Sequence, residues 1–241
     1  MLKIRQKLFC LIYMVKFNRK KSLTHFQDII DEIYGLPDDR LFSLWDLLSN
    51  QERFITRALK GIRKGNKKKI KINLLIAFSW LMAVANRLHI NAEKATWSRF
   101  PAKCSYCGQA PCGCKKIKSS KKARFFRDTA SRPGSVAGFQ KMFRFIYPPE
   151  SRSLFEAGVH LAEEMGELSE AVHCHLGEHR KKQFRQIEIE IADSISCIFG
   201  VANSAKINVA RELEKFYWKN CHDCHKLPCE CNFTMVAKFK S

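Results

Sequence analysis

Two cysteine motifs with the same spacing constrain this chain more than any other feature. The segments CSYCGQAPCGC and CHDCHKLPCEC both follow the pattern C-x2-C-x4-C-x-C. Four thiolates so close together suit a closed tetrahedral zinc site, which leaves no position open for catalysis. We therefore predict two structural zinc knuckles, although the same ligands could hold an iron–sulfur cluster. The predicted ligands are Cys104, Cys107, Cys112, Cys114, Cys221, Cys224, Cys229 and Cys231.

The sequence before each motif is repeated as well. Ile90-Asn91 corresponds to Ile207-Asn208, and Phe26-Gln27 corresponds to Phe139-Gln140 at a separation four residues smaller. A loop can absorb such a difference, because the entropy of loop closure grows slowly with length. These matches predict a tandem duplication with five regions: a basic N-terminal extension (1–21), a first copy (22–114), a basic linker (115–134), a second copy (135–231) and a tail (232–241).

The charge is distributed unevenly between the two copies. The net charge is +20, and residues 1–135 carry 29 basic and 9 acidic residues, whereas the remainder carries 14 of each. A strongly basic half attracts polyanions, so nucleic acid is a candidate partner of residues 1–135. The hydrophobic fraction of 46% supports a buried core and excludes a chain that is disordered throughout.

The compartment follows from the use of cysteine and from the apolar segments. The apolar run Leu8–Val15 has no small-residue cleavage site after it, so we do not expect a secretory signal peptide. Thiols in a cytoplasmic protein stay reduced, which favours metal binding over disulfides. The run Leu74–Ala85 is short for a membrane span. We predict a cytoplasmic protein without a transmembrane segment.

Hydrophobic periodicity predicts an all-α fold. Apolar residues between Leu154 and Val172 recur at helical spacing, as do those between Ile187 and Val201. The alternation in IEIEIAD is typical of a strand, but the longer pattern around it favours a helix. Each copy is expected to contain a short helix, two long antiparallel helices connected by a loop around Gly177 in the second copy, a fourth helix (Val209–Trp218 there) and a knuckle.

Four carboxylates of the second copy form two pairs at helical spacing. Glu164 and Glu167 are three residues apart, as are Glu190 and Asp193, so each pair shares a helix face. If the long helices pack antiparallel, the pairs converge, and a hard divalent cation such as Mg²⁺ or Mn²⁺ relieves their repulsion. The alternative is two solvated acidic helix faces, which are common in proteins.

These residues resemble a known family. EEMGELSEA followed by EIADSI is similar to the ExxE and ExxD signature of the MazG-type nucleotide pyrophosphohydrolases, in the all-α NTP pyrophosphatase superfamily. The resemblance implies Mg²⁺-dependent hydrolysis of a nucleoside triphosphate to a monophosphate and pyrophosphate. It also implies that Glu164, Glu167, Glu190 and Asp193 are the metal ligands. Members of the family generally assemble as dimers or tetramers, so a homo-oligomer is expected.

Other residues near the motif are candidates for supporting roles. Glu163 is placed to act as a base or to assist a metal ligand, although a surface role is also open. Lys181, Lys182 and Arg185 lie between the two carboxylate pairs and are candidates for binding substrate phosphates, although a solvated loop explains them equally well.

The first copy lacks the four ligands. The two separations align Glu164, Glu167, Glu190 and Asp193 with Gln51, Phe54, Asn73 and Ile76. We therefore expect two tandem MazG-like repeats in an intramolecular pseudo-dimer, in which the first copy is a non-catalytic partner. The leading interpretation is an Mg²⁺-dependent nucleotide pyrophosphohydrolase, and the alternative is a nucleic-acid-binding or regulatory zinc protein that reuses the fold.

Overall fold

The structure is a computed structural model that describes residues 14–114 and 130–232, and these ranges contain helices and no strand. The helices are α2 (Leu23–Ile30), α3 (Leu36–Leu41), α4 (Leu44–Arg63), α5 (Lys67–Arg87), α6 (Ala92–Arg99), α7 (Val136–Ile146), α8 (Leu154–Glu178), α9 (Lys181–Ser204) and α10 (Val209–Phe216). A π-helical turn at Asp31–Gly35 precedes α3, and a 3₁₀ turn at Pro149–Ser151 precedes α8. The all-α prediction is confirmed for the described residues.

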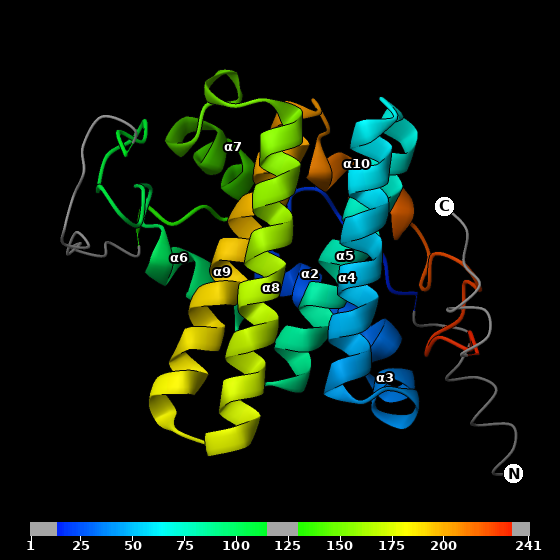
Figure 1. Cartoon of the computed structure of the whole chain (residues 1–241). Helices are drawn as coiled ribbons and strands as arrows, with labels where there is room; N and C mark the ends of the chain where they lie inside the picture. Colours follow the sequence, from blue (N-terminus) through cyan, green and yellow to red (C-terminus); the bar gives the residue numbers. More distant parts are fainter. Residues whose placement is uncertain (1–13, 115–129, 233–241) are drawn as a thin grey trace, which may run out of the picture.

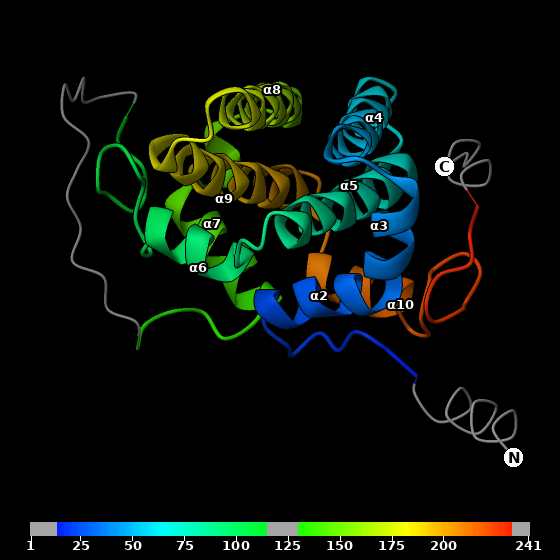
Figure 2. The same ribbon diagram turned by 90° about the horizontal axis from the view of Figure 1, so that it is seen from below.

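The helices form three layers. Two antiparallel pairs, α4 with α5 and α8 with α9, stand side by side (Figure 1). Seen from below, α4 and α8 form the outer layer, α5 and α9 the middle layer, and α2, α6, α7 and α10 cover the far side of the middle layer (Figure 2). Because α5 and α9 are covered on both sides, they contain the longest runs of buried residues: Asn73–Ser79 and Leu81–Ala85 in α5, and Glu190–Ala202 in α9.

The core joins residues 22–114, which we call the first half, to residues 135–231, the second half. Phe199 of α9 packs on Phe78 of α5, with ring centroids 5.7 Å apart, and on Phe143 of α7 at 5.8 Å. All three side chains are at most 1% exposed. Contacts between aromatic rings at these separations are favourable, so the two halves share one hydrophobic core.

One glutamine in each half, buried in the first half and half-buried in the second, makes equivalent hydrogen bonds. In α2, Gln27 Nε2 donates to Asn86 Oδ1 (2.8 Å) and to the Ile90 carbonyl (2.7 Å), while Gln27 Oε1 accepts from the Ala92 amide (2.9 Å). The second half repeats these bonds from Gln140 to Asn203 (3.0 Å), Ile207 (2.7 Å) and Val209 (3.0 Å). The repeated sequence therefore specifies the same local packing twice.

Matching capping boxes start the first long helix of each half. Ser43 caps α4 with Asp46 at the third helical position, and Ser153 caps α8 with Glu156 in the same arrangement. In each box the serine hydroxyl accepts from the backbone and the carboxylate accepts from the serine amide, which satisfies two free donors of the first turn. The two caps therefore align the residues of α4 with those of α8, whatever the lengths of the loops that precede the helices.

The C-terminal segments of the two halves are exchanged. The helix α6 of the first half packs on α9 of the second, and the Cys112 amide donates to the Ile146 carbonyl at 2.8 Å. Conversely, the Cys229 amide donates to the Ile33 carbonyl at 2.8 Å, across to the first half. Each knuckle therefore lies against the other half of the chain.

The connection between α8 and α9 differs from the prediction. Gly177 lies inside α8, and the turn consists of His179 and Arg180, with His179 in the left-handed region at φ 53°. The His179 amide still bonds to the His175 carbonyl (2.7 Å), so helical hydrogen bonding continues past the glycine. The segment IEIEIAD is helical, as the longer periodicity predicted.

The predicted buried segment Leu74–Ala85 forms the central part of α5. Among the described helices, α5 alone is long and apolar enough to cross a membrane, and 72% of its most apolar window is buried inside the protein. Such burial is typical of a core helix, which agrees with the prediction of no transmembrane segment. The predicted tail and most of the N-terminal extension and linker lie outside the described residues.

A buried aspartate makes the stability of the fold depend on pH. Burial raises the pKa of Asp38 to about 7, partly offset by Arg87 and reinforced by Asp39 and Asp31. Since the folded state keeps this proton while the unfolded state loses it near pH 4, stability falls as pH rises from about 4 to about 7.

We expect Asp38→Asn to remove this loss and to stabilise the protein at pH 8 by about 1–3 kcal/mol relative to wild type, since one pKa unit is about 1.4 kcal/mol. Urea unfolding at pH 5 and pH 8 measures the effect. The matched control is Glu52→Gln, because Glu52 is exposed on α4. An Asp38→Asn protein that keeps the wild-type pH dependence would contradict the assignment.

Candidate metal centre in the second half

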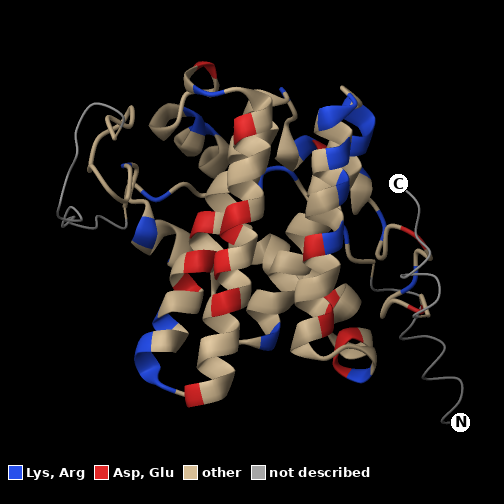
Figure 3. Ribbon diagram, viewed as in Figure 1, with Lys and Arg blue, Asp and Glu red and all other residues tan. Residues whose placement is uncertain are grey.

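The antiparallel pair α8 and α9 brings the predicted carboxylates together. One oxygen each of Glu164, Glu190 and Asp193 lies within 4.8 Å of the others, which is close enough for a shared cation. Glu167, one turn along α8 from Glu164, is exposed, yet its charge contributes to raising the pKa of both Glu190 and Asp193. Acidic residues gather at the middle of the two helices (Figure 3). The sequence pattern thus located a real cluster of carboxylates.

Burial makes this cluster unfavourable without a counter-charge. Glu190 is 4% exposed and Asp193 is 8% exposed. Burial and, to a smaller extent, the neighbouring carboxylates raise the pKa of Glu190 to about 7, against a hydrogen bond from Gln186. Burial also raises the pKa of Asp193, and Arg99 opposes that shift. Carboxylates in such a position need a proton, a cationic side chain or a metal ion.

Two carboxylate oxygens in the cluster have no protein partner. Glu164 Oε2 and Glu190 Oε2 are buried, and no described residue donates a hydrogen bond to either. Buried polar atoms are normally satisfied, so orphaned acceptors in a cluster of carboxylates indicate a ligand. Hard divalent cations such as Mg²⁺ and Mn²⁺ prefer carboxylate oxygens. The residues present therefore fit the ion that the resemblance implies.

The first half supplies a cation to this site. Arg99, the last residue of α6, makes a bidentate pair with Asp193: Nε donates to Oδ1 at 3.0 Å and an Nη donates to Oδ2 at 2.9 Å. Both side chains are 11% exposed. The guanidinium also lies 5.3 Å from the ring centroid of Tyr106, in the first knuckle. Sequence reasoning missed Arg99, because nothing local to α6 marks it as a partner of a residue 94 positions away.

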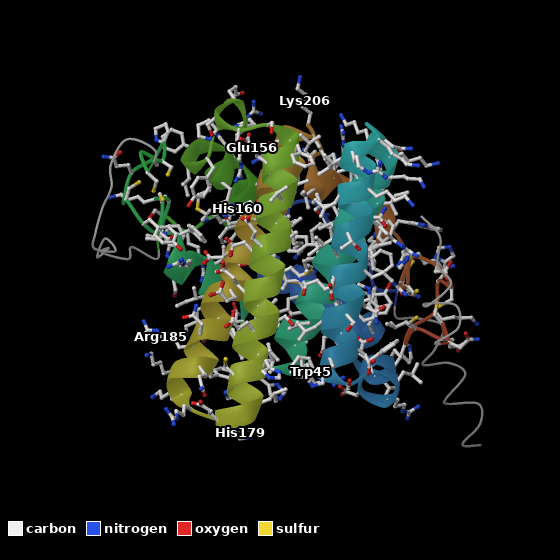
Figure 4. The ribbon with its side chains drawn as sticks, viewed as in Figure 1. Trp45, Glu156, His160, His179, Arg185 and Lys206 are labelled. Atoms are coloured by element: carbon white, nitrogen blue, oxygen red, sulfur yellow. The ribbon has the colours of Figure 1, made fainter. Side chains whose placement is uncertain are left out.

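A second polar group adjoins Glu164. His160 Nε2 lies 3.2 Å from Glu164 Oε1, and His160 Nδ1 lies 3.3 Å from Cys197 Sγ. These three residues are close enough to hold a metal ion of their own. However, both ring nitrogens of His160 already have protein partners, since an Nη of Arg152 also lies 3.4 Å from Nδ1. Figure 4 labels His160 on the face of α8 near this cluster.

The remaining predicted residues lie at the edges of the site. Glu163 is exposed, and its charge contributes to raising the pKa of His160 and Cys197. Lys181, Lys182 and Arg185 are exposed on the first turns of α9, and Figure 4 shows Arg185 near the α8–α9 turn. At 1.5 Å per residue, Arg185 and Lys181 are roughly 8 and 14 Å along the helix from Glu190. Their phosphate-binding role stays a prediction.

An apolar pocket, lined by residues of both halves, lies at the corresponding place in the first half. Aligning the caps Ser43 and Ser153 places Phe54 opposite Glu164 and Arg57 opposite Glu167. The predicted alignment with Gln51 and Phe54 was therefore shifted by about one helical turn, because the loops before the two helices differ in length. Phe54 lines a pocket of ≈ 80 Å³ together with Phe42, Ile76 and Trp80. The conclusion that this half lacks the ligands does not change.

The two cysteine motifs each gather four thiols. In the first, Cys104 Sγ lies 3.4 Å from Cys112 Sγ and 3.6 Å from Cys114 Sγ. In the second, Cys221 Sγ lies 3.5 Å from Cys229 Sγ and 3.9 Å from Cys231 Sγ. Tetrahedral zinc with bonds of about 2.3 Å to sulfur separates its ligands by about 3.8 Å. Both groups are thus arranged to bind zinc, as the spacing predicted.

In comparisons with known proteins, no family model, no curated protein and no solved structure matches the chain.

Proposed function

We propose that this protein is an Mg²⁺-dependent nucleoside triphosphate pyrophosphohydrolase of the MazG type, which converts a (d)NTP and water to a (d)NMP and pyrophosphate. The observation that carries the proposal is the convergence of Glu164, Glu190 and Asp193, with buried oxygens that have no protein donor. An ordinary acidic surface would be solvated and would not leave such atoms buried.

The proposed chemistry assigns a role to each group. Glu164, Glu167, Glu190 and Asp193 would hold the metal, which when bound neutralises phosphate charge and lowers the pKa of a water molecule. Arg99 orients the Asp193 carboxylate, since both of its oxygens are engaged by the guanidinium. Glu163 lies next to the cluster as a candidate base. No covalent nucleophile is required.

The proposal includes two tandem repeats that form an intramolecular pseudo-dimer. The repeated hydrogen bonds of Gln27 and Gln140 and the matched caps support a duplication. The packing of α6 on α9 and of each knuckle on the other half explains why a repeat without ligands would be retained, since it covers the catalytic repeat and supplies Arg99. Assembly into a homo-oligomer and a cytoplasmic location remain predictions.

A second candidate function is binding of nucleic acid by the basic first half. The turn between α4 and α5 carries a dense cluster of exposed cations at one end of the molecule (Figure 3): Arg63, Lys64, Lys67, Lys68 and Lys69. Such a cluster is an electrostatic site for phosphate backbones. It lies at the far end of α4 from the α3 corner and is compatible with the proposed catalysis.

The test of the proposed activity is pyrophosphate release from a panel of ribo- and deoxynucleoside triphosphates with Mg²⁺. We expect release by the wild-type protein and a loss of at least about 100-fold in Glu190→Gln, because the amide keeps the size but cannot supply an anionic ligand. The matched control is Glu170→Gln, which alters an exposed carboxylate of α8.

Wild-type activity in Glu190→Gln would contradict the assignment of the site. Absence of release from folded, metal-loaded wild-type protein would contradict the proposed function. Binding of the same protein to RNA or DNA would then favour the second candidate.

A further inference from the structure

We propose that Arg99 and Arg152 together bind the phosphate chain of the substrate, one on each side of the carboxylate cluster. The inference rests on the proposed function for the identity of the substrate as a polyphosphate. It replaces neither the metal ligands nor the proposed chemistry, and it assigns the phosphate-binding role to residues that the sequence pattern did not single out.

Arg99 lies at the cluster itself. Its two hydrogen bonds to Asp193 are 3.0 and 2.9 Å long and join side chains that are nearly buried. The centroid of the Tyr106 ring lies 5.3 Å from its guanidinium carbon. A guanidinium has five N–H donors, and the pair with Asp193 uses two of its three nitrogens. Tyr106 accepts a further hydrogen bond from the guanidinium, and the donors that remain can reach phosphate oxygens brought next to Asp193, which the planar fork of arginine suits.

Arg152 lies on the other side, one imidazole ring away from Glu164. His160 separates the two, with Nδ1 3.4 Å from an Nη of Arg152 and Nε2 3.2 Å from Glu164 Oε1. Arg152 Nε is buried, and no described residue accepts a hydrogen bond from it. Among the described residues, Arg152 has no carboxylate within ion-pair distance. A half-buried guanidinium in this state is a ready site for an anion.

The helix α9 is shaped to admit Arg152. A Cβ at Gly200 would lie 2.2 Å from an Nη of Arg152, a distance at which the guanidinium would have to move. Gly200 is buried within α9, where glycine is less favourable than alanine by roughly 1 kcal/mol. The guanidinium occupies the space that a side chain at position 200 would need, so the glycine and the arginine form one structural unit.

The repeat equivalents of Arg99, Arg152, Glu164 and Asp193 are all uncharged. At the positions equivalent to Arg152, Glu164 and Asp193 by the caps and the repeat, the first half has Phe42, Phe54 and Ile76, which line its apolar pocket. The residue equivalent to Arg99 is Phe216, which stacks on His222 at 4.3 Å. Both cations are thus present where the carboxylates are present and replaced where they are absent. Pairing with Asp193 explains why Arg99 follows the carboxylates, whereas Arg152 follows them without an ion pair to any described carboxylate.

Carboxylates flanked by two arginines suit a site for a polyphosphate with its metal ion better than a site for a metal ion alone. Carboxylates that bind a cation need no guanidinium beside them, whereas a substrate with several phosphate charges requires more positive charge than one divalent ion supplies. Positive groups on both sides of the cluster would bind successive phosphates of one chain. Lys181, Lys182 and Arg185, at the exposed start of α9, are less suited because solvent screens them.

The test is calorimetric binding of inorganic pyrophosphate, the proposed product, to the full chain with Mg²⁺. We expect the dissociation constant to rise at least 10-fold in Arg152→Ala and in Arg99→Lys, which keeps the charge but loses the fork. Gly200→Ala should have a similar effect, because it displaces the Arg152 guanidinium without removing it. The control Arg144→Ala alters an exposed arginine of α7 and should stay within 2-fold of wild type. Thermal unfolding of each variant establishes that it is folded.

The outcomes separate this inference from the proposed function. Unchanged pyrophosphate affinity in Arg152→Ala, Gly200→Ala and Arg99→Lys overturns the inference, even if the protein hydrolyses nucleotides. Two other results also overturn it: a loss of pyrophosphate affinity only in Arg185→Ala, and no binding of pyrophosphate to the wild-type protein. Weaker binding in the arginine variants, in a protein that releases no pyrophosphate from any nucleotide, supports the phosphate site and overturns the proposed hydrolysis.

Discussion

Replacing Cys229 with serine should lower the zinc content from two ions per chain to one and markedly destabilise the protein. Cys229 is 9% exposed, and its sulfur lies 3.5 Å from that of Cys221 and 3.8 Å from that of Cys224. Because zinc binding to such sites supplies folding free energy, of order 10 kcal/mol in isolated zinc fingers, loss of one ligand removes much of it. A net loss of about 4 kcal/mol would lower the thermal midpoint by roughly 8–16 °C.

Elemental analysis and thermal unfolding measure the two effects. The control is Cys174→Ser, since Cys174 is exposed on α8 and lies outside both motifs. The exchange of segments predicts that the damage reaches the first half, where the Cys229 amide bonds to Ile33 and the Tyr34 hydroxyl donates to Cys221 Sγ at 3.6 Å. Iron in place of zinc in the purified protein would show that the motifs hold a cluster instead.

Truncation of Phe199 should destabilise the whole fold, because this ring joins the two halves. Phe199 is completely buried between Phe78 and Phe143. Replacing such a phenylalanine with alanine typically costs about 3–5 kcal/mol, from lost burial and from the cavity left behind. Urea unfolding should show one transition at a lower midpoint, because the shared core couples the halves.

The matched control for Phe199→Ala is Phe155→Ala, near the start of α8. Phe155 is 61% exposed, so its removal should change stability by at most about 0.5 kcal/mol. A loss below 1 kcal/mol in Phe199→Ala, or two separate unfolding transitions, would show that the halves are independent units and not parts of one core.

Local sequence patterns predicted most of the helices and the carboxylate cluster. The 3.6-residue period identified α8 and α9, and the three-residue spacing of Glu164 with Glu167 and of Glu190 with Asp193 placed each pair on one face. The loop expected around Gly177 was wrong, because one glycine does not end a helix whose next backbone hydrogen bonds still form. The capping signals at Ser43 and Ser153 were visible in the sequence and would have corrected the alignment of the long helices.

The arginines of the site could not be predicted in this way. Arg99 and Asp193 are 94 residues apart and come from different halves, so no periodicity relates them. In the sequence, Arg152 is an ordinary loop residue, and only the structure shows that its guanidinium packs against Gly200 of α9. In each case the evidence is a contact between two different helices or loops, whereas the spacing of residues in the sequence gives information only about one helix at a time.

Local sequence is enough to establish the helical character of the chain, the two thiol-rich motifs and the half that carries the carboxylates. Each of these depends on residues within a few positions of one another, where helix geometry and chain length leave little freedom. Long-range packing is needed to bring α6 onto α9, each knuckle against the other half and Arg99 to Asp193. Those choices depend on how apolar faces distant in sequence bury one another, and many pairings of similar helices satisfy the same local pattern.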